Sequence, residues 1–188
     1  MDSLKLFMLL VGCKPKGRHT EQHDIFFGIG NSLKDLKDDI YTFWPEANHK
    51  IHIDAWREIV QVDGYRVNIF PRSEMSYYQS KETKLFFINL GGYKQNEFEE
   101  YHYKMVVACQ EKEEAIYRAK QTAFYRHTGF EGAPSHIDDK YGIDVDDIYE
   151  IDDILPDHTK KQFCIVLSKN ASPVDDDIHP GYLKLEKL

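Results

Sequence analysis

The triplet His-Ile-Asp occurs twice in this chain and carries the side chains best suited to chemistry. The triplets span residues 52–54 and 136–138. In an extended strand, His52 and Asp54 point to the same face, with their side chains about 7 Å apart. If His23 lies on a neighbouring strand in matching register, two imidazoles and a carboxylate meet, and this donor set suits zinc or ferrous iron. These three residues are therefore the candidate metal ligands.

The same residues allow three other interpretations. Without a metal, a histidine oriented by Asp54 can act as a general base, or the trio can bind a small ligand. Alternatively, His52 and Asp54 are structural, because a histidine can bond a backbone carbonyl and an aspartate can cap backbone N–H groups. Of these interpretations we favour the structural one, because a duplication preserves such a pair as readily as it preserves ligands. The sequence leaves any cofactor unknown.

A longer repeat surrounds both triplets. Lys5 recurs as Lys84, a shift of 79 residues, and the same shift relates three further pairs: Gly12 and Gly91, Glu21 and Glu100, His23 and His102. Beyond the next predicted helix the shift becomes 84, which matches His52 with His136 and Asp54 with Asp138. A period near 80 is typical of a duplicated supersecondary module. The repeat therefore predicts His102, His136 and Asp138 as a second set of candidate binding residues.

Apolar patterning predicts the elements of each half. Consecutive apolar residues indicate a strand covered on both faces, alternation indicates a half-buried strand, and a spacing of three or four indicates an amphipathic helix. In the first half these patterns predict strands over 4–11, 23–29, 50–56 and 65–70, a capped helix over about 32–44, and a tight turn at Asp63-Gly64. In the second half they predict a helix over about 111–127, with Asp147-Ile148 at the position of that turn.

These elements predict an α+β protein. Two tandem strand-strand-helix-strand-strand modules, related by a pseudo-two-fold axis, are expected at residues 1–70 and 84–155, with a linker over 71–83. A further strand and a tail that docks back are expected within 156–188. Because an isolated module of about 70 residues is marginally stable, the two modules are expected to share a core.

Composition narrows the classes of partner. The net charge is −8 without a basic stripe, which argues against nucleic acid, because phosphate contacts supply much of that affinity. The cysteines Cys13, Cys109 and Cys164 form no CxxC pair, and their apolar surroundings predict buried thiols in a reducing compartment. No apolar run reaches transmembrane length. We therefore expect a cytoplasmic monomer or homodimer.

The repeated pattern includes Leu6-Phe7 through Gly12, then His23-Asp24, and then residues 52–56 followed by 62–65. This set of residues resembles a bacterial family, Domain of Unknown Function 1543. The resemblance implies a small cytoplasmic bacterial protein with two copies of the module over about residues 4–155. It implies no activity, because the family has none assigned. The second copy departs from the pattern, with Lys140 in place of Trp56 and Ile148 in place of Gly64.

The leading functional hypothesis is a non-catalytic module that binds an unknown small molecule or a protein. Trp56, Tyr65 and the strand face between them form the candidate binding surface, with packing of Trp56 on the core as the alternative. The second hypothesis is a metal-assisted or acid–base enzyme built on His23, His52 and Asp54. The two hypotheses differ in whether a bound ligand is turned over.

Overall fold

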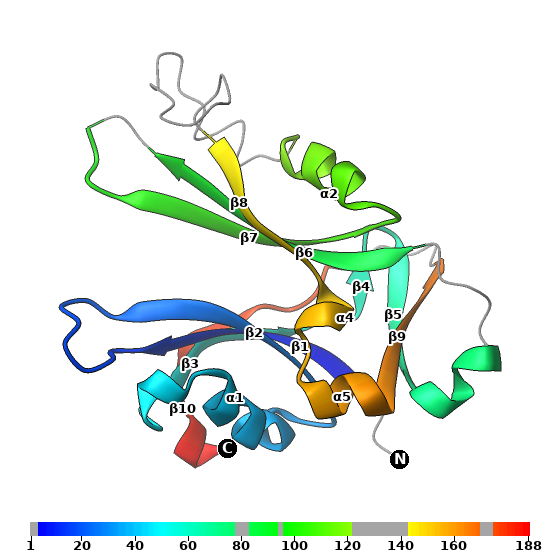
Figure 1. Ribbon diagram of the computed structural model, residues 1–188, viewed down its shortest axis with the longest axis horizontal. Coiled ribbons are helices and arrows are strands. Elements are labelled where there is room, and N and C mark those ends of the chain that lie inside the picture. The colour runs from blue at the N-terminus through cyan, green and yellow to red at the C-terminus, as the bar shows by residue number, and fades with distance from the viewer. Residues whose placement is uncertain (1–3, 78–82, 94–95, 122–142, 170–174) are drawn as a thin grey trace. The chain divides into compact units, whose positions relative to one another are not determined.

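The computed structural model describes residues 4–77, 83–93, 96–121, 143–169 and 175–188 (Figure 1). The chain divides into two compact units. The first unit contains Met1–Gln79 together with Ile154–Leu188, and the second contains Ser80–Asp153. The first unit is therefore discontinuous in sequence, because the C-terminal segment returns to it.

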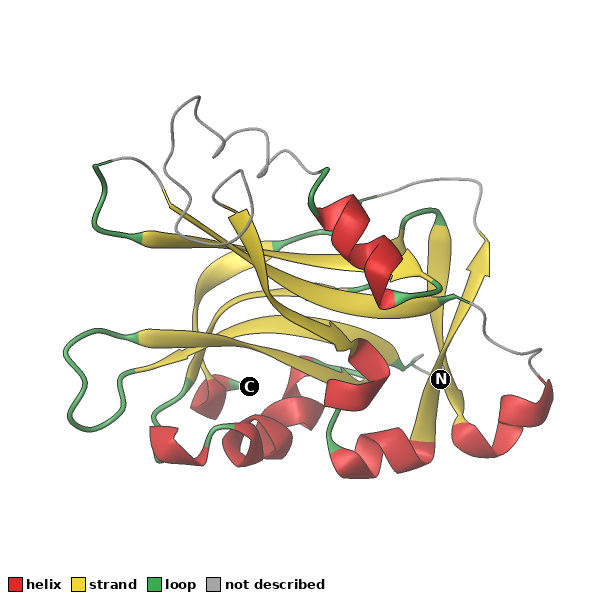
Figure 2. Ribbon diagram, turned by 45° about the horizontal axis from the view of Figure 1, so that its top comes forward, coloured by secondary structure: helices red, strands yellow, loops and turns green. Residues whose placement is uncertain are grey.

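The main sheet of the first unit has the strand order β10-β3-β1-β2, and every neighbouring pair is antiparallel. Its strands are β1 (Lys5–Cys13), β2 (Gln22–Gly30), β3 (His52–Glu58) and β10 (His179–Lys184). The central strand β1 is buried along most of its length, as predicted from its consecutive apolar residues. Helix α1 (Lys37–Phe43) lies along one side of this sheet (Figures 1 and 2).

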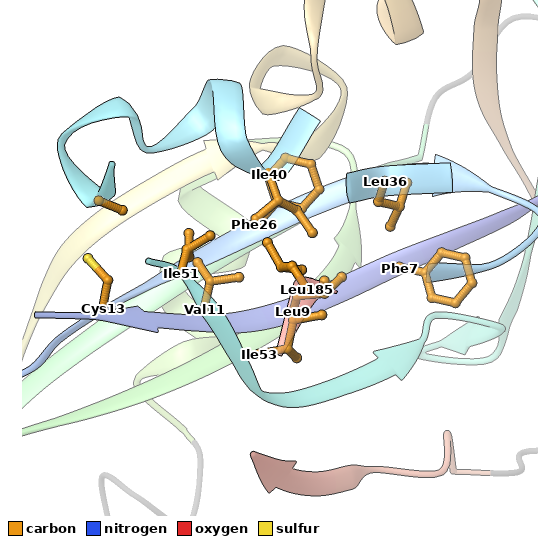
Figure 3. Close-up of a cluster of buried hydrophobic side chains, with 11 residues drawn as sticks. Phe7, Leu9, Val11, Cys13, Phe26, Leu36, Ile40, Ile51, Ile53 and Leu185 are labelled. Atoms are coloured by element: carbon orange, nitrogen blue, oxygen red, sulfur yellow. The ribbon is translucent and has the colours of Figure 1, made fainter. Parts of the chain in front are cut away.

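The core of the first unit lies between that helix and one face of the sheet. Phe7, Leu9 and Val11 alternate along β1 and point into this core, and Ile53 of β3 joins them (Figure 3). The remaining buried members come from β1, β2, the helical segments, the residues before β3 and the tail: Cys13, Phe26, Leu36, Ile40, Ala47, Ile51 and Leu185. Full burial of an aliphatic or aromatic side chain contributes about 1.5–3 kcal/mol, so this face anchors the sheet.

The helix predicted over 32–44 forms in two pieces. A 3₁₀ turn, η1 (Leu33–Leu36), leads into α1, and a second 3₁₀ turn, η2 (Pro45–Ala47), follows it. The backbone N–H of Ser32 donates to Asp35 Oδ2 at 3.1 Å, which confirms the predicted capping box. Pro45 ends the α-helix because it lacks the N–H that the next turn needs.

A second small sheet completes the first unit, with the order β4-β5-β9. Its strands are β4 (Gln61–Val62), β5 (Tyr65–Pro71) and β9 (Phe163–Lys169). Asp63 and Gly64 have φ of 50° and 78°, which are the left-handed values that a two-residue hairpin turn requires. The predicted tight turn is confirmed, and so is the predicted C-terminal strand.

Short helical segments flank these strands. They are η3 (Arg72–Tyr77), α5 (Asp157–Gln162) and η4 (Leu185–Lys187). The tail docks as predicted, because β10 pairs with β3 and Leu185 is 1% exposed within the core.

The second unit contains a sheet of order β7-β6-β8. Its strands are β6 (Lys84–Tyr93), β7 (Glu100–Cys109) and β8 (Ile143–Glu150). Phe86, Ile88 and Leu90 of β6 pack with Ala115 and Ala119 of α2 (Lys112–Ala119). The helix α4 (Ile151–Ile154) follows β8. Among the described residues, no helix is both long and apolar enough to cross a membrane.

The two units repeat one register of strand pairing. Gly12 pairs with His23 as Gly91 pairs with His102, so the shift of 79 holds for the hairpin. On the other side of the central strand, Gly12 pairs with His52, whereas Gly91 pairs with Asp144. The irregularity in pairing also recurs, between Leu10 and Val11 and between Asn89 and Leu90. The residues of β8 that pair with β6 therefore correspond to residues of β3 that lie 92 positions earlier in the chain, whereas the sequence repeat predicted 84.

This register corrects the prediction for the end of the second half. Asp147 and Ile148 were expected at the position of a turn. Instead, both lie within the continuous strand β8, where Ile148 pairs with Ile88. The prediction was wrong because the shift of 84 residues was extended to this segment, whereas the pairing with β6 sets a different register. The mixture of helices and antiparallel sheets confirms the α+β class.

Candidate functional site

Gly12 brings the two candidate histidines of the first unit together. It lies on the central strand β1, opposite His23 on β2 and opposite His52 on β3. Directly paired residues of antiparallel strands place their side chains on the same face. His23 and His52 therefore flank a residue that has no side chain. The sequence hypothesis assumed neighbouring strands, whereas the strand β1 lies between the strands that carry the two histidines.

Asp54 lies at an irregularity in the β1–β3 pairing. Ile53 pairs with Val11 and Ala55 pairs with Leu10, so Asp54 is the extra residue of a β-bulge. The bulge directs its carboxylate over Gly12, toward both imidazoles. Asp54 Oδ2 lies 3.2 Å from His23 Nε2, and Asp54 Oδ1 lies 3.3 Å from His52 Nε2.

Glu21 adds a second carboxylate, which sequence reasoning missed. Its Oε1 lies 3.1 Å from His52 Nε2. Its only signal in the sequence was the match to Glu100 in the repeat. We call the four side chains of Glu21, His23, His52 and Asp54 the Gly12 cluster. They form a row in which carboxylates and imidazoles alternate.

The row needs glycine at position 12. A Cβ atom built there would lie 2.5 Å from Asp54 Oδ2, 2.7 Å from His52 Nε2 and 3.0 Å from His23 Cδ2. A Cβ cannot approach other atoms so closely, so any side chain would displace the cluster. The close packing also places these polar groups within reach of a shared ligand.

The inner groups of the cluster are poorly satisfied. The His52 side chain is 7% exposed, whereas those of His23 and Glu21 are 42% and 46% exposed. The buried atoms His52 Nε2 and Asp54 Oδ2 make no hydrogen bond of good geometry within the described residues. A buried polar atom without a well-formed bond costs about 1–3 kcal/mol. The two ends of the row are therefore exposed to solvent, whereas two buried polar atoms at its centre lack well-formed hydrogen bonds.

The C-terminal strand covers one side of His52. The ring of Tyr182 on β10 lies 4.4 Å from the His52 ring, between centroids, at an interplanar angle of 36°. Sequence reasoning had no signal for this contact, because 130 residues separate the two rings in the chain. Tyr182 holds the imidazole in place while its own side chain stays exposed.

Cys13, beside the cluster on β1, is buried in the core and does not belong to the Gly12 cluster. It belongs to the buried core cluster, and all three cysteines are buried and unpaired, as predicted. Burial, followed by the negative charges of Glu21 and Glu46, raises the pKa of the Cys13 thiol. A raised pKa favours the protonated thiol over the thiolate, which is the form that acts as a nucleophile or metal ligand.

The metal hypothesis for His23, His52 and Asp54 depends on whether their donor atoms surround one point. Across the described residues, no group of three or more His, Cys, Asp or Glu side chains is placed to hold a metal ion. The contacts of the Gly12 cluster run in sequence from one side chain to the next. Such a row differs from the tetrahedral shell of a typical zinc site.

Trp56 and Tyr65 do not form one surface with the cluster. The bulge at Asp54 moves Trp56 to the opposite face of β3 from His52, where it pairs with Leu9 and packs on the core. The sequence placed Trp56 on the face of His52 because simple alternation ignores a bulge. Tyr65 lies on β5, in the other sheet of the unit.

The second set of candidates is only partly described. His102 lies opposite Gly91 on β7, with its Nε2 3.9 Å from Glu100 Oε2. His136 and Asp138, together with Lys140, lie outside the described residues. The register of β8 instead places Asp144 at the position that corresponds to His52.

Two hollows of the first unit lie away from the Gly12 cluster. One, of about 590 Å³, lies beside Phe43 and His158. The other, of about 260 Å³, lies beside Trp56 and His179, whose rings stack at 4.0 Å. Neither hollow is lined by a member of the cluster.

Comparison with known proteins supports the resemblance and the fold. Residues 18–69 match the model of the family described as Domain of Unknown Function (DUF1543). No curated protein matches the chain. The crystal structure of a protein Il1583 from Idiomarina loihiensis is similar over 97% of each chain, with 23% identity and a TM-score of 0.60. This likeness shows a shared fold. The chain thus resembles the DUF1543 family in the segment that contains β2 and β3. This segment includes four of the residues that carried the resemblance in the sequence: His23, His52, Asp54 and Trp56.

Proposed function

We propose that this protein is a non-catalytic binding module and that its ligand site is the Gly12 cluster. The observation that carries the proposal is the pair of buried, poorly bonded atoms, His52 Nε2 and Asp54 Oδ2, at the centre of the row. A ligand that completes their hydrogen bonds recovers a cost of about 1–3 kcal/mol. The exposed ends of the row, His23 and Glu21, allow such a ligand to enter.

A thermal-shift screen of metabolites, followed by calorimetry on the hits, tests this proposal. We expect at least one hit whose binding is lost in His52→Gln and weakened in His23→Gln. The matched control is His102→Gln, which changes the residue at the corresponding register position of the second unit and should leave binding intact. If every hit binds the His52 variant as well as the unmodified protein, the site is not the Gly12 cluster.

An acid–base enzyme on the same residues is the second candidate. Its support is the position of Asp54, whose two oxygens lie near two different imidazoles. A carboxylate in this position can orient a histidine as a general base. Mass spectrometry of each hit after incubation distinguishes the candidates, because a binding module returns its ligand unchanged.

We also propose that the second unit is a second copy of the module. The support is the repeated register. Gly12 and Gly91 each pair with residues of two neighbouring strands, and the same irregularity in pairing lies just before each glycine. An experimental structure would test this by superposition of β1–β3 on β6–β8. A bulge at a different position in β8 would contradict it.

A cytoplasmic location is part of the proposal. Its support is the set of three free, buried cysteines, which is typical of a reducing compartment. Fractionation of cells that express the tagged protein gives the test, with recovery in the soluble cytoplasmic fraction as the expected result.

A further inference from the structure

We infer that the ligand of the Gly12 cluster presents a protonated amidine or amine to the row of side chains. This inference rests on the proposed binding function and names the chemical class of the ligand. It follows from what the four side chains offer, from their burial, and from the way their atoms are arranged.

The cluster offers mainly hydrogen-bond acceptors. Ionised Glu21 and Asp54 have only acceptor atoms. Each neutral imidazole has one donor and one acceptor nitrogen, and the Nε2 atoms that face the carboxylates are the donors. With both imidazoles neutral, the formal charge of the four side chains is −2. The complementary ligand therefore brings N–H donors and positive charge. An anion would meet two carboxylates and few donors.

Burial strengthens this preference. His52 is 5% exposed, and the ring of Tyr182 lies against its imidazole. Electrostatic attraction and charge-assisted hydrogen bonds are stronger where the surrounding water is excluded. A cationic group that donates to Asp54 Oδ2 also supplies the hydrogen bond that this buried acceptor lacks.

The arrangement favours an organic cation over a metal ion. The contacts run along a row from Glu21 Oε1 through His52 and Asp54 to His23. An amidinium has N–H groups that point in several directions within a plane, so it can donate to successive acceptors of a row. A zinc ion needs its donors around one point, and the described residues provide no such group.

The test uses three small probes of nearly equal shape with the full-length protein. Benzamidine is a cation with N–H donors, benzamide is its neutral analogue, and benzoate is its anionic analogue. Chemical-shift titrations to millimolar concentration should show benzamidine binding at β1–β3 at least about tenfold more tightly than benzamide, since charge-assisted bonds are about twice as strong as neutral ones. Benzoate should not shift these resonances.

Isosteric variants locate the site. Glu21→Gln and Asp54→Asn each remove a negative charge with little change in shape, and each should weaken benzamidine binding at least about tenfold. Glu100→Gln is the matched control, because Glu100 is the repeat counterpart of Glu21, and it should leave binding unchanged.

The outcomes separate this inference from the proposed function. If benzamidine fails to bind, or binds equally to the Glu21 and Asp54 variants, the inference is wrong. If benzoate, or zinc added alone, binds in a His52-dependent manner and benzamidine does not, the inference is wrong but the proposed binding function stands. The binding function itself fails only if the metabolite screen gives no ligand that depends on His52.

Discussion

At the scale of single residues, Gly12 determines whether the cluster can exist. It separates two imidazoles that come from different strands, and it leaves the space into which the bulge directs Asp54. The glycine acts here through its lack of a Cβ, which brings four polar side chains close to one another.

Gly12→Ala should therefore reduce both stability and ligand binding. The added Cβ overlaps Asp54 Oδ2 and His52 Nε2, and we expect a loss of about 1–3 kcal/mol in the free energy of unfolding, as for other overpacked sites. Urea denaturation gives the stability, and the ligand found by the metabolite screen gives the binding.

Gly28→Ala is the matched control for that experiment. Its Cβ would lie 2.8 Å from a Leu36 methyl group, on the core side of the sheet, so it should lower stability without moving the Gly12 cluster. Equal loss of binding in both variants would show that binding falls with stability alone.

Asp176 gives a second residue-scale prediction, which concerns pH. Its Oδ1 accepts hydrogen bonds from the backbone N–H groups of Val60 and Gln61, at 3.0 and 3.3 Å. Burial nevertheless raises the pKa of the Asp176 carboxyl above its usual value, although these two bonds and Arg57 act in the opposite direction. A group whose pKa is raised on folding favours the folded state while it is protonated, and this contribution is lost as pH rises through the folded pKa.

Relative to the unmodified protein, Asp176→Asn should therefore increase the free energy of unfolding more at pH 7 than at pH 3. The amide oxygen keeps the acceptor for Val60 and Gln61 but removes the charge that burial disfavours. Urea midpoints at the two pH values measure the effect. Asp177→Asn removes a charge from an exposed neighbouring residue and serves as the control. A stability difference that does not change with pH would contradict the prediction.

At the scale of elements, the C-terminal strand β10 stabilises the edge of the main sheet. It pairs with β3, brings Tyr182 against His52 and His179 against Trp56, and leads to Leu185 in the core. Most of the strand is exposed, so the buried Leu185 is its principal apolar anchor.

Leu185→Ala should lower the free energy of unfolding by about 2–5 kcal/mol, the usual cost of such a truncation in a core. It should also raise hydrogen exchange in β3, which pairs with β10. Ile178→Ala, at a residue that is 66% exposed just before the strand, should change stability by less than about 0.5 kcal/mol. Similar small effects from both variants would mean that the tail does not dock in solution.

At the scale of the whole molecule, the first unit depends on residues from both ends of the chain. β9 pairs with β5 from Tyr65 to Pro71, and β10 pairs with β3. The strands of the second unit pair within residues 84–150. The insertion of the second unit therefore separates parts of the first by many residues.

A chain that ends at Asp153 tests this division. It lacks β9 and β10, so amides of β1–β3 should lose protection in hydrogen-exchange mass spectrometry. Amides of β6 and β7 are the internal reference and should keep most of their protection, because their partners remain. Full protection of β1–β3 in the truncated chain would show that residues 154–188 are not needed for the first unit.

Much of the local structure could be predicted from the sequence. The apolar run of β1, the turn at Asp63-Gly64 and the capping box at Ser32 follow from rules that act over a few residues. The shift of 79 in the hairpin also follows, because β1 and β2 are neighbours in the chain as β6 and β7 are. The candidacy of His23, His52 and Asp54 came from the same repeat.

Tertiary structure decided what depends on distant pairing. The bulge at Asp54 placed Trp56 on the core side of the sheet and directed Asp54 toward both histidines, and β6 set the shift of 92 for β8. Glu21 and Tyr182 reach His52 from separate elements. A one-residue bulge reverses which side chains face the core, and only the packing of the whole sheet sets its position. The sequence therefore identified the two histidines and the aspartate, whereas the fold brought them together.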